Sequence, residues 1–206
     1  FVSELVLGTD CETLLRDGKR PAWTDVLAWA LQIVSVLRFM HRRSILHGDL
    51  RPANLLLLSS GSLKLANCGL AKVYGPEIPP PGENPLALAG FISPEQAAGK
   101  PLTKRSDFYS LGCLLYTLVV GRPPFLGSNL VELIHKHCFV LPERPIHFVP
   151  DLPHEFDALL MRLLAKDPTN RPGSGTLLLE ELTRLWAALE ARGQVPKRVV
   201  SLSKDV

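Results

Sequence analysis

Four stretches of the chain carry apolar residues at the spacing of an α-helix. Between Thr24 and His41 these residues fall three or four positions apart, which predicts a long helix with Thr24 as its N-cap. From Ser106 to Val120 the chain is apolar nearly all round, which predicts a helix buried on every side. Two further stripes predict amphipathic helices nearer the C-terminus: Phe156, Leu159, Leu160, Leu163 and Leu164, then Leu178, Leu182, Leu185, Trp186 and Leu189.

Short apolar runs separated by turn residues predict a small β element. Residues 1–7 form a short apolar run, which predicts a strand that leads into a connector at Gly8. Residues 55–58 are all leucine, and Ser-Ser-Gly separates them from residues 62–65, so this segment predicts a hairpin. Residues 74–84 contain four prolines and two glycines, which predicts an exposed loop because proline removes backbone donors. The order of these elements predicts a mostly helical body with a small β element.

Composition and charge indicate which kinds of binding partner to expect. The 206 residues are 46% apolar and 21% charged, as in a globular protein with one core. The net charge is only +3 and the basic residues are dispersed, so neither nucleic acid nor a membrane surface is expected as a partner. The longest apolar run, residues 111–120, is shorter than the roughly 20 residues that cross a bilayer. Four cysteines without paired spacing favour a reduced, cytoplasmic setting.

Four motifs, in order along the chain, resemble those of protein kinases. Residues 47–57 read HGDLRPANLLL and resemble the catalytic loop, whose pattern is H-R-D-L-K-P-x-N, in its serine/threonine rather than its tyrosine version. Ser93-Pro94-Glu95 resembles the A-P-E that closes the activation segment. SDFYSLGCLLYTLVVGRPPF, at residues 106–125, resembles the buried central helix of the lower lobe. Asp167-Pro168 with Arg171-Pro172 resembles D-P-x-x-R-P.

The resemblance implies an α+β protein kinase-like fold. Residues 1–192 would form the hinge and the mainly helical large, C-terminal lobe with its small β-hairpin. Residues 193–206 would form a C-terminal linker, since they carry no apolar stripe. The N-terminal lobe would be absent from this chain, together with its glycine-rich loop and strand lysine. Since the chain begins at Phe1 with residues typical of the middle of a fold, we expect a piece of a longer protein.

The resemblance also implies catalytic roles for three residues. Asp49 matches the aspartate that orients the substrate hydroxyl and accepts its proton. Arg51 stands where the family has lysine, and it keeps a positive charge near the transferred phosphate on a wider, planar group. Asn54 matches the amide that gives an oxygen to one metal ion, although an asparagine here also caps a turn, and both roles are compatible.

Asn67 is the main departure from the family, because it occupies the aspartate position of the D-F-G motif. That aspartate is the chief anionic ligand of magnesium, and asparagine keeps its shape without its charge. A close charge pair is worth roughly 4 kcal/mol at an effective dielectric near 20, a loss on the order of a thousandfold in binding or rate. We therefore expect weak or altered magnesium binding at Asn54 and Asn67. Cys68 replaces the next residue, phenylalanine, which predicts looser packing.

The usual phosphorylation switch is also missing from the sequence. Gly48 replaces the arginine that pairs with a phosphorylated activation segment. Residues 70–92 contain no serine or threonine, only Tyr74, so the two absences agree. Leu88 or Ala89 falls where serine/threonine kinases carry a threonine that faces the catalytic aspartate.

The resemblance assigns the remaining positions to nucleotide binding or to the scaffold. Glu4 and Val6 match the hinge that pairs with adenine, Asp10 matches the acid that binds ribose, and Leu56 matches the floor under adenine; the apolar positions are equally well explained as core. The scaffold positions are a buried ion pair, an acid that holds the catalytic loop and a histidine packed under that loop: Glu95 with Arg171, Asp107, and His47.

Three functions remain open from the sequence. The first is a kinase-like module that binds ATP but transfers phosphate poorly or not at all, and acts on a protein partner in signalling. The second is an active serine/threonine protein kinase that transfers the γ-phosphate to protein hydroxyls with an atypical metal site at Asn54 and Asn67. The third is a helical interaction module without a nucleotide. The loss of the aspartate at Asn67 favours the first.

Overall fold

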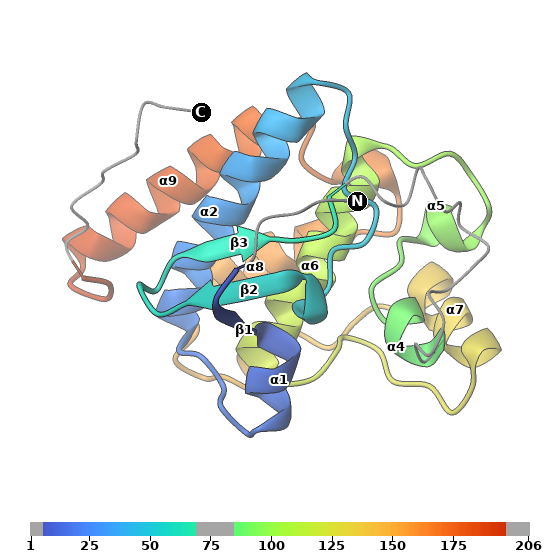
Figure 1. Cartoon of the computed structure of the whole chain (residues 1–206), viewed down its shortest axis with the longest axis horizontal. Coiled ribbons are helices and arrows are strands. Elements are labelled where there is room, and N and C mark those ends of the chain that lie inside the picture. Colours follow the sequence, from blue (N-terminus) through green and yellow to red (C-terminus); the bar gives the residue numbers. More distant parts are fainter. Residues whose placement is uncertain (1–5, 69–84, 197–206) are drawn as a thin grey trace.

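The computed structural model describes residues 6–68 and 85–196. It shows a mainly helical body with a small sheet on one side (Figure 1). The helices are α1 (Cys11–Arg16), α2 (Trp23–Arg42), α4 (Pro85–Ala89), α5 (Pro94–Ala97), α6 (Lys104–Val120), α7 (Leu130–Phe139), α8 (His154–Leu163) and α9 (Gly175–Ala191), with short 3-10 turns at Pro52–Asn54, Pro145–His147 and Pro168–Asn170. The sequence-based expectation of a helical body with a small β element is confirmed.

The sheet contains three antiparallel strands in the order β1 (Gly8–Asp10), β2 (Leu55–Leu58) and β3 (Leu63–Leu65). The predicted hairpin is β2–β3. Residues 1–5 of the predicted first strand lie outside the described residues, Val6 and Leu7 are not in a strand, and Gly8, which was expected to be a connector, begins β1. A Cβ atom at Gly8 would lie 2.7 Å from the carbonyl oxygen of Leu57, so glycine permits the close pairing of β1 with β2.

Helix α6 is the centre of the core, as its apolar sequence predicted. All its residues from Ser106 to Val119 are buried, and α2 and α8 pack against it. It begins two residues earlier than expected, because the side chains of Thr103 and Ser106 form a reciprocal capping box. A Cβ atom at Gly112 would lie 2.8 Å from the Cβ of Leu163, so the absence of a side chain there lets α8 approach closely.

The predicted N-cap of α2 is wrong. The helix begins at Trp23, Ala22 is the N-cap residue and makes no side-chain cap, and Thr24 lies inside the first turn. The indole nitrogen of Trp23 donates to Asp151 at 3.1 Å, a tertiary contact at the first residue of the helix. Among the described residues α2 alone has the length and hydropathy of a membrane span, but half of its most apolar window is buried and it packs against α6 and α9.

Four helices were not expected from periodicity, namely α1, α4, α5 and α7. Capping side chains set the start of three of them: Asp10 for α1, Ser93 for α5 and Asn129 for α7. Val195, near the C-terminus, is buried in the main core. The expected loop at residues 74–84 lies outside the described residues.

Candidate active site

The loop at residues 47–54 runs between α2 and β2 and is held by the first turn of α6. The Asp107 carboxylate accepts the backbone N–H of Gly48 at 2.9 Å and that of His47 at 3.0 Å. Its second oxygen is also 2.7 Å from Nε2 of His41, and the Asp107 side chain is only 2% exposed. Gly48 has a φ of 77°, a left-handed conformation that glycine adopts without strain. One buried carboxylate thus fixes the start of the loop.

His47 is fully buried and fixes the next turn of the loop. Its Nε2 lies 3.1 Å from the carbonyl oxygen of Ala66, and its Nδ1 accepts the N–H of Asp49 at 3.2 Å. Burial lowers the pKa of His47 and outweighs the nearby carboxylates of Asp107 and Asp49, which raise it. The ring is therefore neutral, with its proton on Nε2, and it joins the loop to the segment before Asn67.

Asp49, Arg51 and Asn54 lie together in the loop. The Nε of Arg51 is 3.0 and 3.1 Å from the two carboxylate oxygens of Asp49. The Nδ2 of Asn54 donates to the backbone carbonyl of Asp49 at 2.8 Å and to its carboxylate at 2.7 Å. The Asp49 side chain is 36% exposed while that of Arg51 is 10% exposed. The carboxylate therefore faces solvent on one side and contacts the mostly buried guanidinium on the other.

Asn67 closes this network from the other side. Its Nδ2 donates to Oδ1 of Asn54 at 2.8 Å, and the backbone N–H of Ala66 donates to the carbonyl of Asn54 at 2.9 Å. Asn67 has a φ of 60°, a left-handed conformation that asparagine tolerates better than most residues. Cys68 is exposed, and its thiol donates to the carbonyl of Leu65 at 3.5 Å.

The positions assigned to nucleotide binding are partly described. Asp10 and Leu56 are opposite each other in the β1–β2 register, so the structure brings these two together. The Asp10 carboxylate is the N-cap of α1, and it accepts the N–H and the hydroxyl of Thr13 at 2.8 and 2.9 Å. Val6 is partly buried, and Glu4 lies outside the described residues.

The described residues do not fit a divalent cation well. No group of three or more His, Cys, Asp or Glu side chains suited to a metal occurs in the described ranges. Of Asp49, Asn54 and Asn67, only Asp49 is anionic, and the free oxygen of Asn54 already accepts a hydrogen bond from Asn67. A hard cation of the magnesium type requires several such oxygens together.

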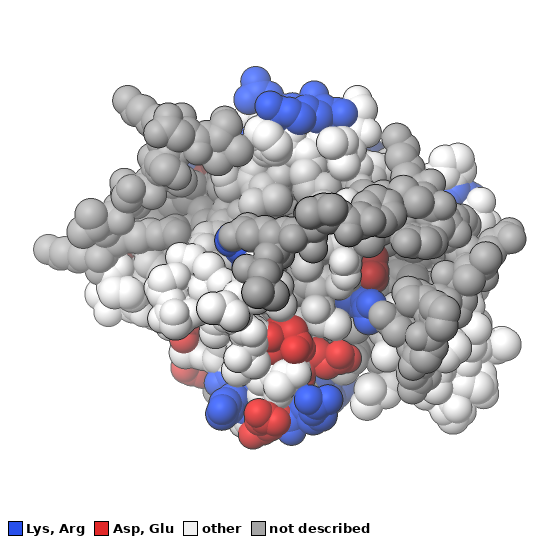
Figure 2. Space-filling view, in the orientation of Figure 1, with Lys and Arg blue, Asp and Glu red and all other residues white. Residues whose placement is uncertain are grey.

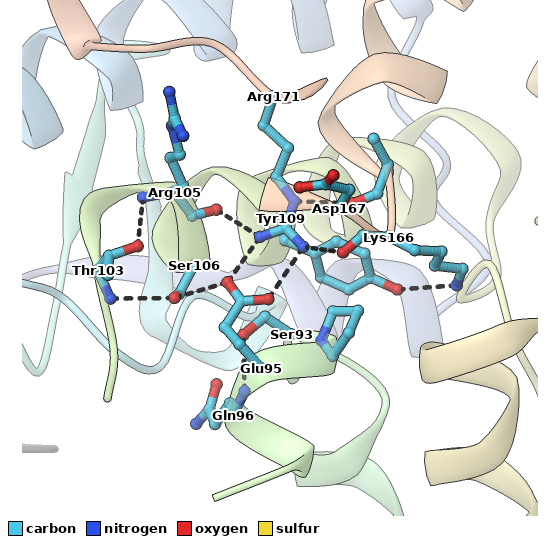
Figure 3. Close-up of polar contacts among 12 residues, drawn as sticks. Ser93, Glu95, Gln96, Thr103, Arg105, Ser106, Tyr109, Lys166, Asp167 and Arg171 are labelled. Atoms are coloured by element: carbon cyan, nitrogen blue, oxygen red, sulfur yellow. Dashed lines mark hydrogen bonds and ion pairs between the residues drawn. The ribbon is translucent and has the colours of Figure 1, made fainter. Parts of the chain in front are cut away.

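A buried ion pair joins the Ser93–Glu95 segment to the C-terminal helices (Figure 3). Arg171 donates from Nη1 and Nη2 to the two oxygens of Glu95 at 2.7 and 3.0 Å, and Ser106 donates to Glu95 at 2.8 Å. Burial raises the pKa of Glu95, but the hydrogen bonds from Arg171 and Ser106 outweigh it and hold the pKa below its usual value. The other three hydrogen bonds of the guanidinium go to backbone carbonyls: Arg105, Ala165 and Lys166.

His135, His137 and Cys138 are neighbours in sequence, but their side chains lie in different surroundings. His135 is exposed, whereas His137 is fully buried with Nδ1 3.0 Å from the hydroxyl of Tyr109. The thiol of Cys138 faces the carbonyl of Pro94 at 4.0 Å. The three side chains therefore make separate contacts. The surroundings of His137 differ from those of His135 and Cys138, as expected for residues two and one positions away on a helix.

Sequence reasoning missed the polar network around Tyr109. Lys166 donates to the carbonyls of Lys136 and His137 at 3.1 and 2.7 Å, and lies 3.4 Å from the Tyr109 hydroxyl. Burial lowers the pKa of Lys166 to about 8. The network joins the end of α7 to α6, and only the apolar run around Tyr109 signalled its burial.

Acid is expected to destabilise the protein through His137. Burial, followed by the charge of Lys166, lowers the pKa of His137 from 6.5 to about 3. Below pH 6.5 the unfolded chain therefore binds a proton that the folded chain does not, and stability falls as the pH drops from 6.5 towards 3. We expect a loss of roughly 1.4 kcal/mol per pH unit from this group, measured by urea unfolding between pH 7 and 5.

The matched variants are His137→Gln and His154→Gln, since His154 is exposed. His137→Gln should reduce the acid sensitivity of the unfolding free energy, and His154→Gln should leave it as in the wild type. Equal acid sensitivity in both variants would contradict this origin.

Charged side chains form separate groups on the face that Figure 2 shows. Lys and Arg gather over the C-terminal end of α2, and mixed basic and acidic side chains lie around α1.

Comparison with known proteins gives a consistent assignment. Residues 1–183 match the family model described as the protein kinase domain. The chain is 36% identical over 173 residues to a probable serine/threonine-protein kinase of Streptomyces coelicolor, covering 83% of this chain and 26% of that protein. It is 32% identical over 174 residues to the serine/threonine-protein kinase PknB of Mycolicibacterium smegmatis, covering 84% of this chain and 27% of that protein. The chain thus spans about a quarter of the length of these curated relatives.

Proposed function

Because this chain belongs to the protein kinase family, we propose that it is a serine/threonine kinase-like domain that binds ATP and transfers phosphate poorly or not at all. On this proposal the chain acts in the cytoplasm by engaging a protein partner. Residues 1–192 would supply the hinge and the large C-terminal lobe of the kinase fold, and residues 193–206 a linker.

The hydrogen bond from Asn67 to Asn54 is the observation that carries the proposal. Phosphoryl transfer needs anionic oxygens that hold divalent metal beside the phosphates. Here the position that should bring the main negative charge brings an amide, and its nitrogen points at the neighbouring ligand position. Loss of a full charge from such a cluster costs roughly 4 kcal/mol at an effective dielectric near 20.

An active kinase with an atypical metal site is the second candidate. Asp49 supports this candidate, because its carboxylate is accessible to solvent and contacts the guanidinium of Arg51. A general base that acts beside a transferred phosphate needs such access and a positive charge nearby. In that case Asp49 would accept the proton of the substrate hydroxyl and Arg51 would balance charge on the transferred phosphate.

Transfer from radiolabelled ATP to a generic protein substrate distinguishes these candidates. The assay uses the intact polypeptide with Mg²⁺, and compares it with Asp49→Ala and with Asp17→Ala, which removes an exposed aspartate at the C-cap of α1. We expect all three proteins to give the same background, because the metal ligand is missing in each, while a fluorescent ATP analogue still binds.

Two outcomes would overturn the proposal. Transfer that Asp49→Ala abolishes and Asp17→Ala preserves would establish the active kinase. Failure of the analogue to bind, with or without Mg²⁺, would favour a helical interaction module without a nucleotide.

A further inference from the structure

The orientation of the Asn54 amide is fixed by its neighbours. The side-chain atom of Asn54 that faces Asp49 lies 2.8 Å from a backbone carbonyl and 2.7 Å from a carboxylate oxygen. Both of these atoms only accept hydrogen bonds, so the Asn54 atom between them must be the nitrogen. The oxygen of Asn54 therefore faces Asn67.

The orientation of Asn67 follows from that of Asn54. An oxygen 2.8 Å from the Asn67 amide needs a donor, and the nitrogen of Asn67 is the atom that supplies it. The hydrogen bonds then run in one direction, from Asn67 to Asn54 and from Asn54 to Asp49. Every contact in the series pairs a donor with an acceptor.

An aspartate at position 67 would break this pairing. Its carboxylate would place an anionic oxygen against the oxygen of Asn54 at the 2.8 Å that now separates donor from acceptor. Two acceptors at that distance repel each other unless a proton or a cation lies between them. The amide nitrogen of Asn67 supplies the positive end that a cation would otherwise supply.

The charges of the site are also balanced without a metal. Asn54 and Asn67 are neutral, and the carboxylate of Asp49 lies 3.0 Å from the guanidinium of Arg51. The Asn67 nitrogen carries two hydrogens, of which Asn54 accepts one; among residues 6–68 and 85–196 no residue accepts the other. That N–H is on an exposed side chain, where a phosphate oxygen can reach it.

We propose that the amide of Asn67 takes the place of a divalent cation in this site, so that the protein binds nucleotide without requiring a metal ion. The nucleotide part of this inference rests on the proposed function, while the cation part rests on the hydrogen-bond network alone. Asn67 is thereby the residue that makes nucleotide binding independent of magnesium.

Thermal unfolding with the metal alone tests the cation part. We expect the Tm of the wild type to be equal in EDTA and in MgCl₂. Asn67→Asp is expected to melt about 2–4 °C lower in EDTA, and MgCl₂ should restore the loss. Asparagine and aspartate both tolerate the left-handed backbone at this position, so the variant is expected to fold.

Gln32→Glu is the matched control for exchanging an amide for an acid. Gln32 accepts the N–H of Leu63 at 3.1 Å, and a glutamate keeps that accepting oxygen. Its Tm should be equal in EDTA and in MgCl₂. A wild-type Tm that rises with MgCl₂, or an Asn67→Asp variant that does not respond to it, would overturn the cation part.

Titration of the intact polypeptide with a fluorescent ATP analogue tests the nucleotide part. We expect the wild-type Kd in EDTA and in MgCl₂ to agree within about twofold, and the Kd of Asn67→Asp to be about tenfold lower in MgCl₂ than in EDTA. Binding by the wild type only in MgCl₂ would overturn this inference while leaving the proposed ATP binding in place. No binding in either buffer would overturn the proposed function and the nucleotide part together, and the Tm data would still decide the cation part.

Discussion

Replacing Arg171 with methionine is expected to lower the free energy of unfolding by about 3–5 kcal/mol. The Arg171 side chain is fully buried and Glu95 is 9% exposed, so the variant would leave a carboxylate inside the protein without its partner. It would also remove the donor to three backbone carbonyls, at Arg105, Ala165 and Lys166. Urea unfolding at neutral pH measures the loss.

The exposed pair Arg192–Glu155 provides the control. Its two side chains are 52% and 47% exposed, and the same exchange at Arg192 should cost less than about 1 kcal/mol. Arg171→Met combined with Glu95→Leu should recover part of the loss, because no charge then remains buried. Equal losses at Arg171 and Arg192 would show that the buried pair does not support the fold.

The long helices could be predicted because a helix that is buried along one face carries apolar residues at the helical period. Helices α2, α6, α8 and α9 each bury an apolar face, or the whole surface in the case of α6. The short helices α4 and α5 have five and four residues, too few for a period to appear. The start of α2 was predicted wrongly because its N-cap residue is Ala22, which makes no side-chain cap and so leaves no signal in the sequence.

Part of the candidate site could be anticipated from motifs alone. The motifs suggested that Asp49, Asn54 and Asn67 share one site, and the structure brings them within hydrogen-bond distance of each other in series. The direction of the hydrogen bonds could not be predicted, since it depends on which amide atom faces Asp49 in three dimensions.

The polar network around Tyr109 could not be predicted from the sequence either. It joins Tyr109 on α6, His137 on α7 and Lys166 after α8, and no short-range spacing connects these positions. Each residue alone is compatible with a surface position or with the core. Only the packing of α6, α7 and the segment after α8 brings their polar atoms together.

Asp107→Asn is expected to lower the free energy of unfolding by about 2–3 kcal/mol and to loosen the start of the candidate catalytic loop. The carboxylate now accepts two backbone N–H groups, from His47 and Gly48, and contacts His41. An asparagine keeps one accepting oxygen and turns an NH₂ group towards a donor, so at least one buried N–H loses its partner.

Two measurements separate a local effect of Asp107→Asn from a general loss of stability. Hydrogen exchange at the amides of His47 and Gly48 should accelerate more than exchange in α9, because these amides donate directly to the altered side chain. Asp10→Asn is the matched control, since Asp10 caps α1 and asparagine is an equally good N-cap, so its unfolding free energy should change by less than about 0.5 kcal/mol. If both variants lose the same stability and the two loop amides remain protected, Asp107 does not hold the loop. If only Asp107→Asn accelerates exchange at the two loop amides, the loop geometry that presents Asp49 and Asn54 to a ligand depends on the Asp107 carboxylate. That carboxylate lies almost sixty residues away from Gly48 in sequence, in the first turn of the most buried helix.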